Sequence, residues 1–118
     1  MKNSDSNIKD ILSKLQQEGE RKNIETQKVE IRVPSFEDNI LRLQWENGFA
    51  IKCDIDEYNN VVLSANSAGL ISLARHLLTL AQSDVPEYTH FHLDEYDSLE
   101  SGSKELIIVK RDIQPGQS

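Results

Sequence analysis

The stretch that most constrains the fold is NSAGLISLARHLLTLAQ, Asn66 to Gln82, because its apolar residues recur at helical spacing. Asn66 or Ser67 can cap a helix here, and Pro86 prevents it from continuing. The apolar face is wide, and its members are Leu70, Ile71, Leu73, Ala74, Leu77, Leu78, Leu80 and Ala81. A polar stripe lies opposite, formed by Ser72, Arg75, His76, Thr79 and Ser83. We therefore predict a largely covered helix that lies on a sheet, meets a second element such as an N-terminal helix or a subunit partner, and turns His76 to solvent.

Short segments of alternating apolar and polar residues on both sides of this helix predict the sheet. They are residues 29–33, 41–45, 49–55 and 61–63 before the helix, and residues 88–93 and 104–111 after it. A three-residue loop of Glu46 to Gly48 would pair Trp45 with Phe49, Leu43 with Ile51 and Leu41 with Cys53, all on the core face. Such a loop requires a left-handed residue at its end, which Gly48 supplies.

The N-terminal residues Met1 to Asn23 contain a second helical pattern, with a narrow apolar stripe of Ile8, Ile11, Leu12 and Leu15. The predicted fold is α+β: a mainly antiparallel sheet of about six strands packed against one long amphipathic helix, plus the N-terminal helix. We assign residues 1–26 to the N-terminal helix and its linker, residues 27–111 to a single α+β domain, and residues 112–118 to a disordered tail.

Composition and charge narrow the classes of partner. The formal net charge of −7 disfavours nucleic acid and anionic lipid, and it favours a basic protein partner. No apolar run is long enough to span a membrane, and the N-terminus lacks the apolar core of a signal peptide, so we expect a cytoplasmic protein. Cys53 is the only cysteine and falls on the inward side of an alternating segment, which predicts a small core residue.

The candidate functional residues lie in THFHLDEYDSLESGS, Thr89 to Ser103. On a strand, Phe91 and Leu93 would face the helix, and His90, His92 and Asp94 would share the opposite face. Two histidines at i and i+2 beside a carboxylate resemble a set of zinc ligands, so a zinc-binding domain or small metal-dependent enzyme is one alternative. No catalytic or phosphate-binding motif occurs in the chain, and we therefore expect a protein without catalytic activity or cofactor.

The acidic loop that follows, Glu95 to Ser103, favours recognition of another protein. Leu99 is expected to anchor it, and loops held by a rigid sheet often carry binding residues. The predicted partner-binding set joins the loop to the strand before it: His90, His92, Asp94, Glu95, Asp97 and Glu100. A further alternative is an oligomerising structural domain without a ligand, and a homodimer is compatible with any of these functions.

Two segments, GLISLARHLLTLAQSDVP and HFHLDEYDSLESGSKELIIVK, resemble the bacterial immunity protein 32 family. That family combines a leucine-rich helix, a strand with His-x-His-Leu, an acidic loop with Ser-Leu-Glu and a closing apolar strand. The resemblance covers roughly Asn66 to Lys110, under half of the chain, and leaves the N-terminal helix without a counterpart. It implies a cytoplasmic antidote of a bacterial polymorphic toxin system, which binds and blocks a cognate toxin such as a basic nuclease domain.

Overall fold

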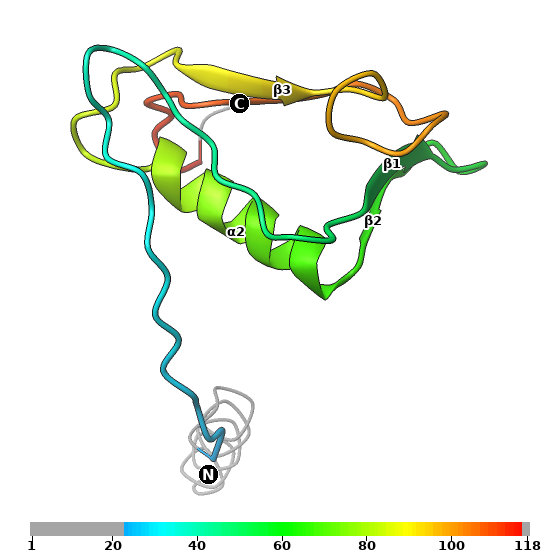
Figure 1. Ribbon diagram of the computed structural model, residues 1–118, viewed down its shortest axis with the longest axis horizontal. Helices are drawn as coiled ribbons and strands as arrows, with labels where there is room; N and C mark the ends of the chain where they lie inside the picture. Colours follow the sequence, from blue (N-terminus) through cyan, green and yellow to red (C-terminus); the bar gives the residue numbers. More distant parts are fainter. Residues whose placement is uncertain (1–22, 117–118) are drawn as a thin grey trace, which may run out of the picture. The chain divides into compact units, whose positions relative to one another are not determined.

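The computed structural model describes residues 23–116. The chain divides into two units, Met1–Glu30 and Ile31–Ser118, and all helices and strands of the described residues lie in the second unit. Their order is β1 (Ile51–Ile55), β2 (Val61–Ala65), α2 (Ser67–Leu80), β3 (His90–Leu93) and β4 (Leu106–Val109) (Figure 1). No helix among residues 23–116 is long and apolar enough to cross a membrane.

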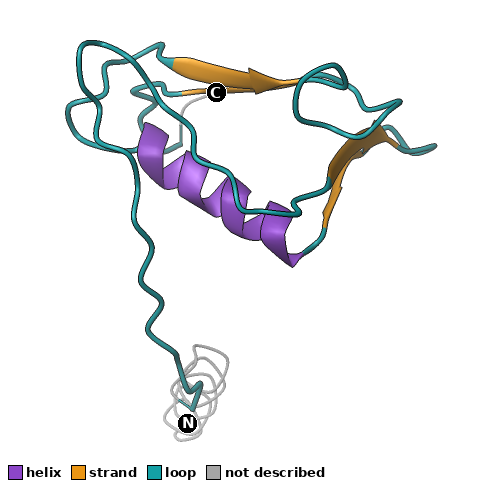
Figure 2. Cartoon of the chain, in the orientation of Figure 1, coloured by secondary structure: helices purple, strands orange, loops and turns teal. Residues whose placement is uncertain are grey.

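The α+β content is confirmed, but the predicted sheet of about six strands is wrong. The described residues contain four strands, and these form two separate antiparallel pairs, β1 with β2 and β3 with β4 (Figure 2). Residues 29–33 and 41–45 alternate in sequence as predicted, yet they form no strand. The predicted N-terminal helix falls in residues 1–22, outside the described residues.

Residues 32–46 run beside α2 instead of joining a sheet, as the cyan-to-green trace in Figure 1 shows. Polar side chains of the helix bond to their backbone: Ser72 Oγ accepts from the Glu46 amide at 2.8 Å, and Arg75 Nε donates to the Arg32 carbonyl at 3.0 Å. Farther along, Gln82 Nε2 donates to the Pro34 carbonyl at 2.9 Å. The helix thus satisfies backbone groups that would otherwise require a neighbouring strand.

This arrangement reverses the predicted orientation of α2. Ser72, His76 and Thr79 are at most 1% exposed, so the prediction that His76 faces solvent is wrong. Only two leucines of the wide apolar face, Leu73 and Leu80, are buried. The prediction failed because it assumed a sheet under the helix, whereas the irregular segment of residues 32–46 selects the hydrogen-bonding side of the helix.

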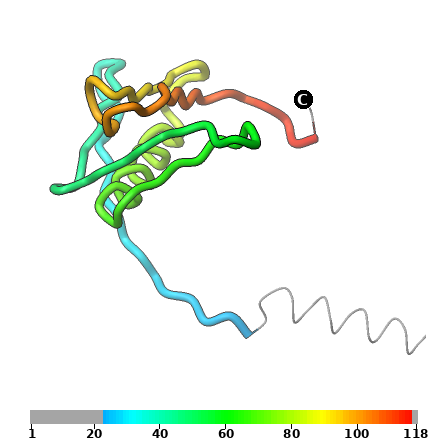
Figure 3. Tube along the Cα trace, turned by 90° about the vertical axis from the view of Figure 1, so that its right-hand side faces the viewer, coloured from blue at the N-terminus to red at the C-terminus, as the bar shows by residue number. Residues whose placement is uncertain are grey.

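The start of α2 is fixed against the β1–β2 hairpin, whose two strands run side by side in green in Figure 3. The predicted cap at Asn66 is confirmed: its Oδ1 accepts from the amides of Gly69 at 2.8 Å and Ala50 at 3.0 Å. Gly69 allows close contact, because a Cβ there would meet the Ala50 carbonyl oxygen at 2.7 Å and Ile51 Cγ1 at 2.9 Å. The hairpin and the helix therefore pack as one unit.

The core joins both hairpins to the helix. Its buried members are Ile51, Cys53, Leu73, Leu80, Val85, Phe91, Leu93 and Leu99, and the prediction of Cys53 as a core residue is confirmed. Trp45 and Phe49 stack at 4.3 Å between ring centroids, and Gly48 has a φ of 78°, as the three-residue loop requires. The predicted strand pairs Leu43–Ile51 and Leu41–Cys53 are wrong, because Ile51 pairs with Ala65 and Cys53 with Leu63 of β2.

Candidate functional site

The β3–β4 hairpin presents one face to the core and one to solvent. Along β3, His90 and His92 are exposed while Phe91 and Leu93 are buried, so the predicted alternation is confirmed. Pairing with β4 sets His90 opposite Val109 and His92 opposite Ile107. Directly opposed residues of an antiparallel pair point to the same side, so the two histidines share their outer face with two exposed aliphatic residues.

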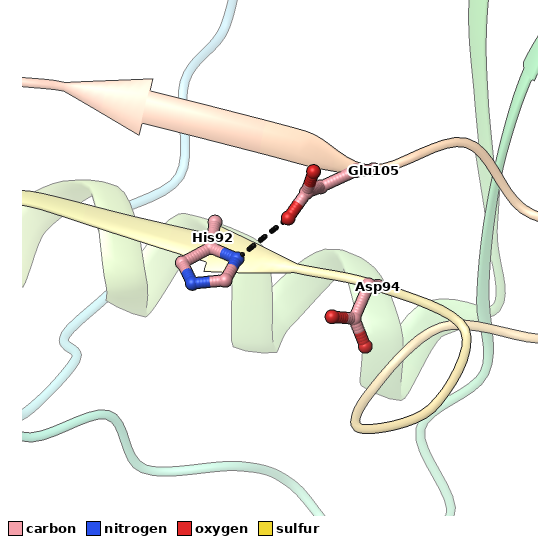
Figure 4. Close-up of side chains that lie close together, drawn as sticks. All are labelled: His92, Asp94 and Glu105. Atoms are coloured by element: carbon pink, nitrogen blue, oxygen red, sulfur yellow. Dashed lines mark hydrogen bonds and ion pairs between the residues drawn. The ribbon is translucent and has the colours of Figure 1, made fainter.

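Three side chains at the end of this face form a group: His92, Asp94 and Glu105 (Figure 4). His92 Nδ1 lies 2.9 Å from Glu105 Oε2, and one ligand atom from each of the three lies within 4.8 Å of the others. His90 is not part of this group; its Nδ1 lies 3.2 Å from the Tyr88 carbonyl oxygen. The predicted metal set of His90, His92 and Asp94 is thus not the one that the structure brings together.

Glu105 was missed because it is distant in sequence from the His-x-His motif. The register of β3 and β4 could have identified it: Glu105 precedes Ile107 by two residues, which places it diagonally next to His92 on the same face. His92 and Glu105 form an ion pair when the imidazole is protonated. Their side chains are 52% and 51% exposed, so the pair contributes about 1 kcal/mol or less to stability.

The acidic loop after β3 is a closed turn. The Asp94 carbonyl accepts from the amides of Asp97, Ser98 and Leu99 at 2.8–3.2 Å, and Leu99 is 5% exposed. Glu95 Oε2 accepts from the Gly102 amide at 3.0 Å, and Gly102 has a φ of 85°, which suits glycine at the point where the chain reverses. The prediction that Leu99 anchors the loop is confirmed.

Residues 100–104, at the end of this loop, lie along the edge of β1 that does not pair with β2. The Glu100 amide donates to the Ile51 carbonyl at 2.8 Å, and the Lys104 amide donates to the Cys53 carbonyl at 2.7 Å. The Cys53 amide donates in turn to Ser103 Oγ at 3.1 Å. The loop therefore connects the two hairpins and takes the place of a third strand beside β1, which holds its backbone in one conformation.

The six predicted binding residues differ in whether their side chains form hydrogen bonds within the loop. Asp94 Oδ1 accepts from the Tyr96 amide at 3.0 Å, and the Glu95 carboxylate closes the loop, so both support its conformation. Asp97 and Glu100 are exposed, and within residues 23–116 their carboxylates make no hydrogen bond or ion pair. Of the four carboxylates in the set, these two are the ones that no hydrogen bond or ion pair within residues 23–116 engages.

His76 is a further titratable group that sequence reasoning misplaced. Its ring lies edge-on to Trp45 at 4.2 Å and to Phe91 at 5.7 Å, and neither ring nitrogen has a hydrogen-bond partner among residues 23–116. Burial, and to a lesser extent the charge of Arg75, lowers its pKa from 6.5 to about 4. A neutral imidazole enclosed by aromatic rings serves as a core side chain here, separate from the outer face of β3–β4.

Comparison with known proteins gives one match. Residues 60–111 match the family model described as Immunity protein 32, which runs from the end of the β1–β2 turn to just beyond β4. No curated protein and no solved structure matches the chain. The match confirms the resemblance to the immunity protein 32 family over just under half of the chain, including the histidine strand and the acidic loop.

Proposed function

Because residues 60–111 match Immunity protein 32, we propose that this chain is an immunity protein that binds and neutralises a cognate toxin of a bacterial polymorphic toxin system. The observation that most supports this proposal is that the match spans β3, β4 and the whole acidic loop between them. The protein acts in the cytoplasm and by binding rather than by catalysis. Its partner-binding residues are His90, His92, Asp94, Glu95, Asp97 and Glu100.

The proposed mechanism is recognition of a basic toxin surface by a preformed acidic loop. Asp97 and Glu100 project from a loop whose backbone is bonded to β1, so little conformational freedom is lost when a partner binds. The net charge of −7 accelerates the encounter with a basic domain and disfavours nucleic acid as a competitor. For a nuclease toxin, the two carboxylates would occupy the place of substrate phosphates.

Growth protection tests this proposal. A cognate toxin domain, sought among the genes that neighbour the gene of this chain, is co-expressed with the wild-type chain, with Asp97→Lys/Glu100→Lys, or with the control Glu30→Lys/Glu57→Lys. The control changes the net charge equally at two exposed residues outside the matched range of residues 60–111. We expect the wild type and the control to protect and the loop variant to fail. Loss of protection in both variants would show that net charge, not the loop, matters.

The His92, Asp94 and Glu105 group supports a second candidate function, the binding of a divalent cation such as zinc. Against it, zinc bonds of about 2.0–2.2 Å bring ligand atoms to roughly 3.3 Å from one another, whereas this group spans up to 4.8 Å and is largely exposed. Native mass spectrometry after zinc addition distinguishes the two functions. One zinc bound in the wild type and none in Glu105→Gln would establish the cation site.

A further inference from the structure

The outward side of α2 carries an uninterrupted apolar stripe. Its large members are about half exposed: Leu70 at 55%, Ile71 at 45%, Leu77 at 47% and Leu78 at 48%. Ala74 and Ala81 are exposed on the same side. The helix thus turns its hydrogen-bonding side inward and four large aliphatic side chains outward, the reverse of an ordinary surface helix. Such a contiguous exposed patch marks an interaction surface.

The spacing of the stripe is that of a helix–helix contact. Leu70, Ala74, Leu77 and Ala81 alternate by four and three residues, which is the periodicity of a packed helix seam. The two alanines allow another helix to approach to about 8 Å between axes. At the C-terminal end of the stripe, a depression of about 330 Å³ between α2 and β4 offers space for an incoming side chain. It is lined by the apolar Leu77, Leu80, Ala81 and Val109 and by the cationic Lys110 and Arg111.

The charges of α2 itself do not oppose a second copy of the chain as the occupant of the stripe. α2 contains no carboxylate, and its only charged side chain, Arg75, is held on the inward side by Glu46 at 2.7 Å and by two backbone carbonyls. Two copies of a chain with a net charge of −7 repel one another over most of their surface, but no like charges would meet along this helix. A basic partner, by contrast, would gain no electrostatic attraction from a stripe that carries no charge.

We propose that the chain forms a homodimer in which α2 packs antiparallel against α2 of a second copy. A twofold axis beside Ala74 would set Leu70 of one copy against Leu78 of the other, and Ile71 against Leu77, so that the large residues fill the gaps beside the alanines. Such an isologous contact is self-complementary and closes with two copies. This proposal does not rest on toxin binding, since the stripe lies on α2 and the acidic loop follows β3.

Sedimentation velocity of the full chain at a series of concentrations tests the dimer. We expect dimerisation with a Kd of roughly micromolar, in keeping with a modest interface. Leu77→Glu places a charge in the contact and should raise that Kd roughly tenfold or more. The matched control is Ile107→Glu on β4, where the native side chain is 55% exposed, and it should leave the Kd unchanged. Circular dichroism establishes that both variants are folded.

Cross-linking gives a second readout that does not depend on a destabilising charge. Ala74→Cys would bring two thiols together at the twofold axis and form an interchain disulfide on mild oxidation, whereas Ile107→Cys would not; the native Cys53 is buried. A wild-type chain that stays monomeric at all concentrations overturns the proposal, whether the stripe is then covered by residues 1–22 or by the toxin. So does a dimer that Ile107→Glu weakens and Leu77→Glu does not.

Discussion

The burial of His76 makes a quantitative prediction about acid stability. The folded-state pKa of about 4 lies below the value of 6.5 expected in the unfolded chain, so the unfolded chain binds the proton more tightly. The contribution of neutral His76 to the free energy of unfolding is therefore present in full above about pH 6.5, and it is lost as the pH falls from there toward 4. At about 1.4 kcal/mol for each pKa unit, the full loss is about 3 kcal/mol, of which roughly 2 kcal/mol falls between pH 7 and pH 5.

The variant His76→Leu separates this contribution from general acid unfolding. Leucine is apolar and of similar size, and it removes two buried nitrogens that have no hydrogen-bond partner in the part of the chain that the structure describes. It forfeits the edge contacts with Trp45 and Phe91, so at pH 7 we expect a free energy of unfolding within about 1 kcal/mol of the wild type. At about pH 5 the variant should be the more stable protein by roughly 1–2 kcal/mol.

Urea unfolding followed by circular dichroism at a series of pH values measures both curves. His90→Leu is the control, because it makes the same substitution at an exposed histidine on the outer face of β3, outside the core. Asp56 does not interfere: hydrogen bonds led by the Asn60 amide lower its pKa below 3.8, so it titrates outside the window. A His76→Leu variant that retains the wild-type slope between pH 7 and pH 5 would show that His76 is not the source of the acid sensitivity.

Four further outcomes are expected. Gly69→Ala should lower the free energy of unfolding by about 1–3 kcal/mol in urea titration although alanine favours helices, because the added Cβ meets the Ala50 carbonyl at 2.7 Å; a stabilised variant would contradict this. Asn66→Ala should cost about 1–2 kcal/mol in the same assay, since Asn66 Oδ1 accepts two backbone amides, whereas Asn47→Ala should cost less. Ser103→Ala should cost about 1–2 kcal/mol and speed hydrogen exchange of the Cys53 amide; unchanged exchange would show that Ser103 does not hold the acidic loop on β1. Added zinc should leave the melting temperature unchanged in both the wild type and Glu105→Gln, and a rise confined to the wild type would favour the cation site.

Local sequence signals predicted the parts of this fold that depend on local interactions. The cap at Asn66, the left-handed Gly48 and the alternation along β3 each follow from the chemistry of one or two residues. The partial burial of Leu41, Leu43 and Trp45 also agrees with their predicted inward face. The prediction of which strands pair with one another failed. Alternation shows which side of a segment is buried, but it does not show which other segment lies beside its backbone.

The orientation of α2 was unpredictable for a related reason. A helix with apolar residues on most of its circumference can bury either side, and the choice depends on its neighbour. Here the neighbour is residues 32–46, an irregular segment whose backbone groups have no strand partner. Ser72 and Arg75 therefore point inward and form hydrogen bonds with that backbone. At the candidate site, the histidines and acidic residues were identifiable from the sequence, but the role of Glu105 required the register of β3 against β4.

The most direct test of the proposed function is calorimetric titration of this chain with a toxin domain that its neighbouring genes are found to encode. We predict a one-to-one complex per chain with a Kd of roughly nanomolar, weakened by added salt. Asp97→Lys/Glu100→Lys should raise the Kd roughly a hundredfold or more, and the control Glu30→Lys/Glu57→Lys should change it little. A wild-type chain that does not bind would contradict the proposed function, and equal affinity of the two variants would contradict the role of the acidic loop.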